Sequence, residues 1–392
     1  MPGPAKTLRR PGDLAAAGLV PPEAVPALER VAARYAVAVT PAMLDLIDPA
    51  DGRDPVARQF VPDPAELDEA PGELADPVGD AAHSPLEGVV HRYPDRVLLK
   101  PLHLCPVYCR FCFRREAVGP GGAAALSDAA LAAALAYVAA RPEVWEVILS
   151  GGDPLVLSPR RLAGITRGLA AIGHVRVVRL HTRVPAVSPE RVTAALVRAL
   201  RAPGRATYVV LHANHPRELT DAARRACARI VDAGVPMLGQ SVLLRGVNDD
   251  PGTLGALMRA FVEARVKPYY LHHADLARGT AHLRTTVGHG QALARSLRGR
   301  HSGLCQPTYV LDIPGGHGKS PLGPSYVAAA EGAGEGAERY VVEDFRGRRH
   351  AYPPRGAGAG AGRGEPATRG ERRTDPAAGA GSEPGGPPTR AG

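Results

Sequence analysis

Short aliphatic runs alternate with amphipathic, helix-like stretches between residues 90 and 312, and this alternation restricts the fold more than any other feature. Strands and helices that alternate at this spacing form βαβ units, which assemble into a parallel sheet. We therefore predict an α/β fold, a partial (βα)6 barrel with a seventh strand-like run near its end. The predicted strands are Arg96–Leu102, Glu146–Leu149, Val175–His181, Thr207–Leu211, Pro236–Leu244, Pro268–His272 and Thr308–Asp312. The predicted helices are Asp128–Ala140, Pro159–Ile172, Pro189–Arg201, Glu218–Ala233 and Thr253–Ala264.

Polar residues follow the first six predicted strands, at the end where barrel enzymes carry their active sites. Polar residues at one strand end are commonplace, but polar residues at all six indicate an active site at this rim. These residues are Cys105–Cys112, Ser150–Asp153, His181–Arg183, His212–His215, Gln240 with Ser241, and His272–Asp275.

Three cysteines after the first strand have the spacing CxxxCxxC: Cys105, Cys109 and Cys112. Three thiolates can bind three irons of a [4Fe–4S] cluster and leave the fourth iron open to a substrate. The spacing resembles the signature of radical S-adenosylmethionine (SAM) enzymes. A zinc site with His103 as the fourth ligand is the alternative, although structural zinc usually has paired CxxC-like spacings. A disulfide framework is disfavoured because this long chain has only five cysteines.

A glycine-rich loop runs from Asp312 to Lys319 after the last predicted strand. Its Gly-Lys-Ser ending is close to a phosphate-binding loop, but Ile313 stands where that motif requires glycine. We therefore interpret Lys319 as an amine that forms a Schiff base with a carbonyl cofactor. Upstream, Arg92, Tyr93 and Arg96 are suited to binding a phosphate, or else form surface ion pairs.

The formal net charge of +9 first suggests nucleic-acid binding. However, arginines scattered through helices and an aromatic content of only 4% argue against it. No apolar run approaches the length of a membrane span. We therefore expect a cytoplasmic protein that binds neither nucleic acid nor membranes. The predicted segments are a helical, wrapping N-terminus (1–85), the barrel (86–290), a segment carrying Lys319 (291–354) and a disordered tail (355–392).

Taken together, the motifs resemble the lysine 2,3-aminomutase family of radical SAM enzymes that also use pyridoxal 5′-phosphate (PLP). The resemblance covers about residues 25 to 330. Because many motifs occur in order, the resemblance is specific. The matching stretches are HRYPDR (91–96), CxxxCxxCxRR (105–115), SGGDPL (150–155), HTRVP (181–185), QSVLLRGVND (240–249), YYLHHADLARGTAHLRT (269–285) and DIPGGHGK (312–319).

The resemblance implies a role for each matching residue. The three cysteines would bind the [4Fe–4S] cluster, and Lys319 would bind PLP covalently. Arg114 would pair with the substrate carboxylate, whereas Asp275 and Asp312 would bind the distant ammonium of lysine. The residues implied for PLP are Arg92, Tyr93, Arg96 and Lys319. The residues implied for SAM are Gly151, Gly152, Asp153, His181 and Gln240.

The implied reaction is the interconversion of L-lysine and β-lysine by a 5′-deoxyadenosyl radical, with PLP carrying the migrating amino group. It requires a reductant such as flavodoxin or ferredoxin. Two alternatives remain: a lysine isomerase that supplies β-lysine for modifying elongation factor P, and an aminomutase for another amino acid such as glutamate. A non-catalytic iron–sulfur protein would be a different class. Because no cysteine follows Cys305, we expect no zinc and no oligomer that depends on zinc, although another homo-oligomer stays open.

Overall fold

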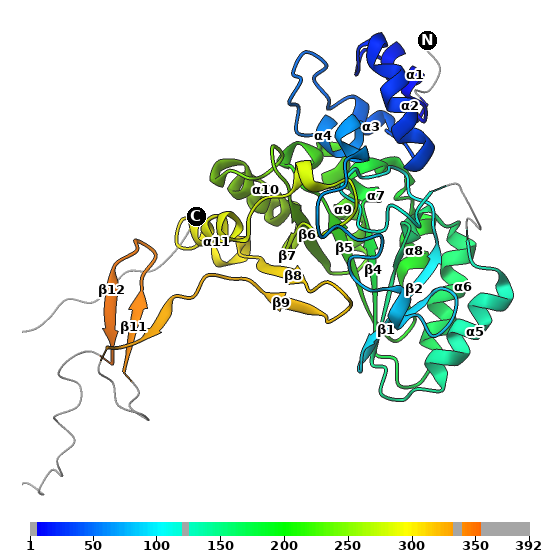
Figure 1. The fold of residues 1–392 in the computed structure, drawn as a ribbon. Coiled ribbons are helices and arrows are strands. Elements are labelled where there is room, and N and C mark those ends of the chain that lie inside the picture. The colour runs from blue at the N-terminus through cyan, green and yellow to red at the C-terminus, as the bar shows by residue number, and fades with distance from the viewer. Residues whose placement is uncertain (1–5, 120–124, 332–338, 354–392) are drawn as a thin grey trace, which may run out of the picture. The chain divides into compact units, whose positions relative to one another are not determined.

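One curved sheet organises the fold in this computed structural model, which describes residues 6–119, 125–331 and 339–353 (Figure 1). Its nine strands lie in chain order, so each strand neighbours the next one along the sequence. Strands β2 to β8 run parallel, and antiparallel β1 and β9 lie at the two edges. The strands are β1 (Val89–Tyr93), β2 (Arg96–Leu102), β3 (Glu146–Gly151), β4 (Val177–Thr182), β5 (Ala206–His212), β6 (Met237–Leu243), β7 (Val266–His273), β8 (Thr308–Asp312) and β9 (Lys319–Pro321).

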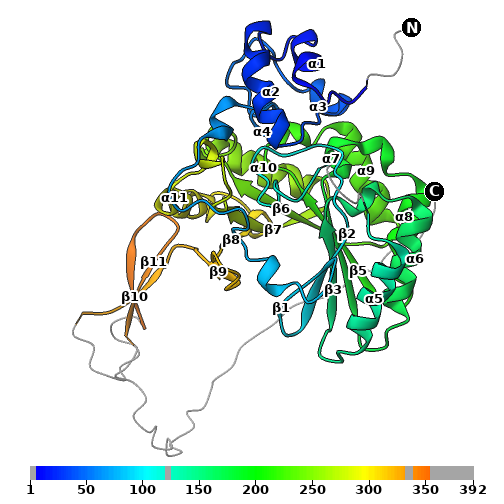
Figure 2. The same ribbon diagram turned by 45° about the vertical axis from the view of Figure 1, so that its right-hand side comes forward.

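Helices cover the convex face of this sheet (Figure 2). Each of the longer ones begins at a side chain that accepts a backbone N–H of the first turn, as Ser158 does from Arg161. Their apolar stripes pack against the strands; in α6, for example, Leu162, Ile165 and Leu169 are buried. These helices are α5 (Asp128–Ala139), α6 (Pro159–Ala170), α8 (Ala194–Leu200), α9 (Asp221–Asp232), α10 (Pro251–Glu263) and α11 (Val287–Leu297).

The predicted fold class is confirmed, because the predicted βαβ units form an open parallel barrel with β8 as the additional strand. One predicted helix, Pro189–Arg201, is wrong. A helical turn, α7 (Val184–Val187), a 3₁₀ turn (Pro189–Arg191) and α8 replace it. The break occurs because the Thr193 side chain accepts the N–H of Leu196 and starts a new helix there.

Short helices and turns make up the segment before the barrel. They are α1 (Pro11–Ala16), α2 (Val25–Arg34), α3 (Pro41–Leu44), α4 (Ala57–Phe60) and the 3₁₀ turns Pro22–Ala24, Pro64–Leu67 and Ala81–His83. Further 3₁₀ turns within and after the barrel are Pro154–Val156, Pro216–Glu218, Ala281–Leu283 and Gly303–Cys305. Buried polar contacts attach the segment before the barrel to the barrel itself. For instance, the side-chain amide of Gln59 donates to Glu218 at 3.0 Å.

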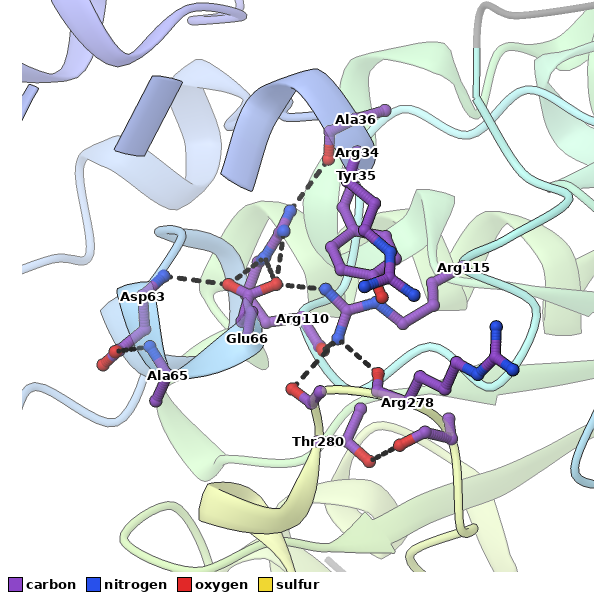
Figure 3. Close-up of polar contacts among 12 residues, drawn as sticks. Arg34, Tyr35, Ala36, Asp63, Ala65, Glu66, Arg110, Arg115, Arg278 and Thr280 are labelled. Atoms are coloured by element: carbon purple, nitrogen blue, oxygen red, sulfur yellow. Dashed lines mark hydrogen bonds and ion pairs between the residues drawn. The ribbon is translucent and has the colours of Figure 1, made fainter. Parts of the chain in front are cut away.

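A second buried attachment is the Glu66 network, which we define as Glu66, Arg110 and Arg115 (Figure 3). The Glu66 carboxylate is fully buried and pairs with Arg110 Nη2 at 2.5 Å and with Arg115. Arg110 also donates to the carbonyl of Ala36, and Arg115 to that of Gly279. Burial alone would raise the pKa of Glu66, but the two guanidinium groups lower it overall. The network therefore joins the N-terminal segment, the cysteine loop and the loop after β7.

The C-terminal part of the described chain forms a second compact unit. Within it, β10 (Val327–Ala329), β11 (Tyr340–Glu343) and β12 (Arg349–Tyr352) form an antiparallel sheet. The predicted disordered tail, 355–392, lies outside the described residues, and the predicted domain boundaries stay predictions. No helix in the described part of the chain is long and apolar enough to cross a membrane.

We expect Glu66→Ala to destabilise the fold by about 3–5 kcal/mol, because it leaves two buried guanidinium groups without their carboxylate. Differential scanning calorimetry would detect this as a lower Tm. Glu69→Ala is a matched control from the same segment. The Glu69 side chain is 44% exposed and pairs with Arg34 at the surface, so its loss should cost about 0–1 kcal/mol. Equal Tm shifts in the two variants would contradict this account.

Candidate active site

The fold brings several of the predicted site residues together, although they come from different strands and loops. In β4, Val178, Leu180 and Thr182 are buried, whereas Arg179 and His181 alternate with them and are only partly buried. The electrostatic neighbours of His181 include His272 of β7, Lys319 of β9 and Arg114 of the cysteine loop. Side chains from distant parts of the sequence therefore share one interior.

The three cysteines lie partly buried on the loop after β2, and none is in a disulfide. Burial raises the pKa of the Cys105 thiol, and raises that of Cys112 to about 11. The Arg183 guanidinium donates from Nη1 to Cys109 Sγ at 3.0 Å and pairs with Glu218 at 2.5 Å. A metal-bound thiolate would accept a stronger hydrogen bond from this arginine.

Gly151 at the end of β3 and Gly152 after it pack closely against residues 100–104, which lead into the cysteine loop. The N–H of Gly152 donates to the carbonyl of Leu102 at 2.8 Å. A Cβ on Gly152 would lie 2.3 Å from the carbonyl oxygen of Leu104, so this close approach requires glycine. The buried Asp153 carboxylate accepts from Thr182 Oγ1 at 2.7 Å and from the N–H of Arg183 at 2.7 Å. The side chain of Asp153 thus ties the ends of β3 and β4 together.

The other two residues predicted for SAM lie on the barrel strands. His181 Nε2 is buried without a hydrogen-bond partner among the described residues. Burial lowers the pKa of His181 well below its usual value, which favours the neutral ring. Gln240 is partly buried on β6, in register with His212 of β5.

Lys319 faces Asp312 across the antiparallel pair of β8 and β9. Its ammonium lies 2.6 Å from each Asp312 carboxylate oxygen. His272 Nδ1 is 3.7 Å from the same carboxylate. Burial opposes ionisation of Asp312, but His272 and Lys319 hold its pKa below the usual value. The carboxylate is therefore an ammonium acceptor in this structure.

Two of the residues predicted for the PLP phosphate lie near Lys319, within antiparallel β1 rather than before the first strand. The Tyr93 hydroxyl accepts the backbone N–H of Lys319 at 2.8 Å. Arg92 Nη1 lies 4.0 Å from Asp312, and its buried Nε has no hydrogen-bond partner among the described residues. Arg96 instead lies over the Tyr93 ring at 3.9 Å and pairs with Asp95.

The residues predicted for the substrate also reach this interior. Arg114 Nε donates to the carboxylate of Asp80 at 2.7 Å. Asp275 is partly buried, and its electrostatic neighbours are Asp312, Lys319, Arg114 and Arg92. Burial, followed by the charge of Asp312, raises the pKa of Asp275 to about 7.

Sequence reasoning missed several residues that contact this site. Arg183 was placed at the predicted active-site rim but given no role, and its contact with Cys109 requires the folded chain. On β2, partly buried Leu98 and Lys100 alternate with the buried Val97 and Leu99. The Lys100 ammonium lies 3.8 Å from the Asp80 carboxylate. Asp80 belongs to the acidic, proline-rich stretch Asp51–Ser84, which we call the connector. This stretch has no periodicity, so no local signal distinguished Asp80 from its neighbours.

Comparison with known proteins agrees with this arrangement. Residues 99–254, which contain the cysteine loop and most of the barrel, match the radical SAM superfamily. The protein is therefore a radical SAM enzyme. Residues 294–360 match the profile described as Lysine-2,3-aminomutase. Together with the relatives described next, these matches show that the chain belongs to the lysine 2,3-aminomutase family, so it is an isomerase that uses a [4Fe–4S] cluster, SAM and PLP.

The chain is 42% identical to L-lysine 2,3-aminomutase of Clostridium subterminale over 79% of its own length and 73% of the relative. It is 40% identical to L-lysine 2,3-aminomutase of Acetoanaerobium sticklandii over 83% of its own length and 77% of the relative. It is also 35% identical to glutamate 2,3-aminomutase of Clostridioides difficile, over 77% and 71% of the two chains. The predicted family is thereby confirmed.

The described residues fit two of the cofactors of this family, the cluster and PLP. Three unpaired thiols on one loop form a donor set suited to three irons. The partnerless Nε of Arg92 is a buried donor suited to an anion such as a phosphate. Lys319 is exposed at the start of β9, after Gly315, Gly316 and Gly318 with positive φ. His317, which interrupts the glycines, is also exposed.

Replacing Asp275 should change the pH dependence of stability in protein without PLP or substrate. The folded pKa of about 7 exceeds the ordinary value of 3.8, so wild-type stability falls as pH rises between these values and the penalty is complete above the folded pKa. Asp275→Asn removes this penalty. We expect the variant to gain roughly 1–3 kcal/mol relative to wild type between pH 4 and pH 8.

Thermal melting at a series of pH values measures this effect. Asp45→Asn is the control, because Asp45 is exposed on the N-terminal segment. If the Tm difference between Asp275→Asn and wild type did not depend on pH, the raised pKa of Asp275 would be wrong.

Proposed function

We propose that the protein interconverts L-lysine and β-lysine by moving the amino group between neighbouring carbons. The observation that carries this proposal is the acceptor made by Asp312 and Asp275 inside the barrel. Asp312 already binds an ammonium, that of Lys319, at 2.6 Å. The contact shows that this carboxylate can accept an amino group inside the barrel. The distant ammonium of a lysine substrate would need such an anion, because its burial without one would be costly.

Arg114 supports the same proposal from the other end of the substrate. Its guanidinium is partly buried, and the electrostatic neighbours of Asp275 include it. A guanidinium binds a carboxylate through two hydrogen bonds, which orients an amino acid along the pocket. Cationic and anionic anchors at opposite ends match a long diamino acid. For glutamate, Asp275 and Asp312 would face the second carboxylate and repel it.

For the cofactors, we propose the cysteine triad as the ligands of the cluster, Lys319 as the covalent anchor of PLP, and Arg92, Tyr93 and Arg96 as its phosphate region. For SAM we propose contacts with Gly151, Gly152, Asp153, His181 and Gln240. Asp153 would contact SAM through its backbone, because its carboxylate already accepts hydrogen bonds from Thr182 and Arg183. When bound, the cluster and SAM supply hydrogen-atom abstraction, and PLP supplies a π-system for the migrating nitrogen. The barrel residues orient the reacting atoms and exclude water.

An external one-electron donor such as flavodoxin or ferredoxin would reduce the cluster, because the described chain offers no further cysteine cluster for electron entry. We further propose that the enzyme works in the cytoplasm, where thiols stay reduced. A homo-oligomer is compatible with this function and can be measured by light scattering.

The decisive experiment is an anaerobic assay with both candidate substrates. The protein would be reconstituted with iron, sulfide and PLP, then given dithionite and SAM. Mass spectrometry would follow L-lysine and L-glutamate separately. We expect β-lysine from L-lysine and no β-glutamate, because Asp275 and Asp312 favour an ammonium over a carboxylate.

The other outcomes of this assay are informative. Formation of β-glutamate without β-lysine would overturn the proposed substrate but keep the aminomutase reaction. SAM cleavage with neither product would overturn the assignment of Arg114, Asp275 and Asp312 as a lysine pocket.

Replacing Lys319 by alanine should remove the visible absorbance of protein-bound PLP and reduce activity to background, because Lys319 is the proposed covalent anchor. The iron content should stay near that of wild type, since the cysteines lie on a different loop. Lys6→Ala, at an exposed position, is the control and should retain both properties. Loss of iron together with PLP in a folded Lys319→Ala protein would contradict the separation of the two sites.

A further inference from the structure

One carboxylate in the connector before the barrel contacts cations from three different parts of the site. Asp80 Oδ2 lies 2.7 Å from Arg114 Nε and 3.8 Å from Lys100 Nζ, and Oδ1 lies 3.2 Å from Arg92 Nη2. All four side chains are between 12% and 16% exposed. We call these four residues the Asp80 cluster.

Asp80 contacts only part of each guanidinium. Arg114 uses Nε for Asp80, and its Nη1 lies 3.5 Å from the Ser150 hydroxyl. Arg92 uses Nη2 for Asp80 and for the carbonyl of Val78. Nη1 of Arg92 remains directed toward Asp312, and its Nε is buried without a partner. Each arginine therefore keeps N–H groups for another anion while its orientation is restrained.

The connector itself is well fixed at this point. The side chain of Asp76 accepts the backbone N–H groups of Asp80 and Ala81 at 2.9 and 2.8 Å. Gly79 packs so closely on the Lys319 loop that an added Cβ would lie 2.6 Å from the Gly316 nitrogen. The position of the Asp80 carboxylate thus depends on the same loop that carries Lys319.

The three cations of the cluster keep the Asp80 carboxylate ionised. Burial alone would raise the pKa of Asp80, but Arg114, Lys100 and Arg92 lower it overall, so the group is an anion. Without this anion, three cations would lie close together in a poorly solvated place. Their repulsion would separate Arg92 from Arg114.

We propose that Asp80 is a positioning residue that aligns Arg92 for the phosphate of PLP and Arg114 for the carboxylate of the substrate. This inference rests on the proposed function for the role of Arg114, whereas the role of Arg92 concerns PLP alone. Asp80 would act through the two arginines without contacting either ligand. Because one oxygen serves each arginine, an amide at this position can serve only one of them.

The test is Asp80→Asn, compared in PLP-free protein for binding of PLP and of pyridoxal, which lacks the phosphate. We expect the dissociation constant of PLP to rise about tenfold or more, as for the loss of a hydrogen bond to a charged group. Pyridoxal binding should stay close to that of wild type. In the reconstituted enzyme, the KM for L-lysine should rise by a similar factor with a smaller change in kcat.

Two variants complete the design. Asp80→Glu retains the charge and should recover much of the PLP affinity. Glu87→Gln makes the same carboxylate-to-amide change at an exposed position just before β1, and should behave as wild type. If Asp80→Asn does not fold, Asp80→Ser allows the same comparison, because it also removes the charge and keeps an acceptor oxygen.

The outcomes separate this inference from the proposed function. If Asp80→Asn binds PLP as well as or better than wild type, Asp80 does not position Arg92 and the inference is overturned. It is also overturned if PLP and pyridoxal weaken equally, since that indicates general damage. If wild type forms no β-lysine, the proposed function fails, but the comparison of PLP with pyridoxal still decides the role of Asp80.

Discussion

The buried carboxylate of Glu66 is the contact on which the cysteine loop and its surroundings depend. It lies in the N-terminal segment, yet both of its guanidinium partners, Arg110 and Arg115, belong to the cysteine loop. Burying three charges carries a large desolvation cost, which their attraction and the extra hydrogen bonds offset. Such a network contributes little net stability but strongly disfavours other placements of the loop. The loop that carries the thiols is therefore held by contacts between residues 44 and 49 positions apart in sequence.

Two acids in the barrel, Asp312 and Asp275, differ in their pKa because their surroundings differ. Asp312 is ionised beside Lys319, whereas the neighbouring Asp275 has a pKa of about 7. Two close carboxylates cannot both ionise easily in a poorly solvated site. A bound ammonium would favour ionisation of both. The pair is thus better suited to a cationic group than to an anionic one, which agrees with a diamino acid as the substrate.

Regular elements were largely predictable, because strand–helix alternation is a local pattern with a fixed period. Arg96–Leu102 and Thr308–Asp312 form strands with the predicted bounds. The helix predicted at Pro189–Arg201 failed because apolar spacing does not reveal that Thr193 restarts the helix. The connector residues Glu66 and Asp80 were also missed. An isolated acid in a proline-rich stretch has the same local appearance whether it is exposed or buried between arginines.

The sequence by itself predicted the fold class from strand–helix alternation and the family from a series of matching motifs. It also predicted the cysteine triad as the cluster ligands and Lys319 as the PLP lysine, because these motifs are local in the chain. The tertiary structure decided the rest: that Asp312 accepts the ammonium of Lys319, that Arg183 contacts Cys109, and that Asp80 joins Arg92 to Arg114. No periodicity or motif in the sequence indicates that the two residues of each contact meet. The physical reason is that ionic contacts depend on distance and burial in space, which exist only after the strands have brought distant segments together.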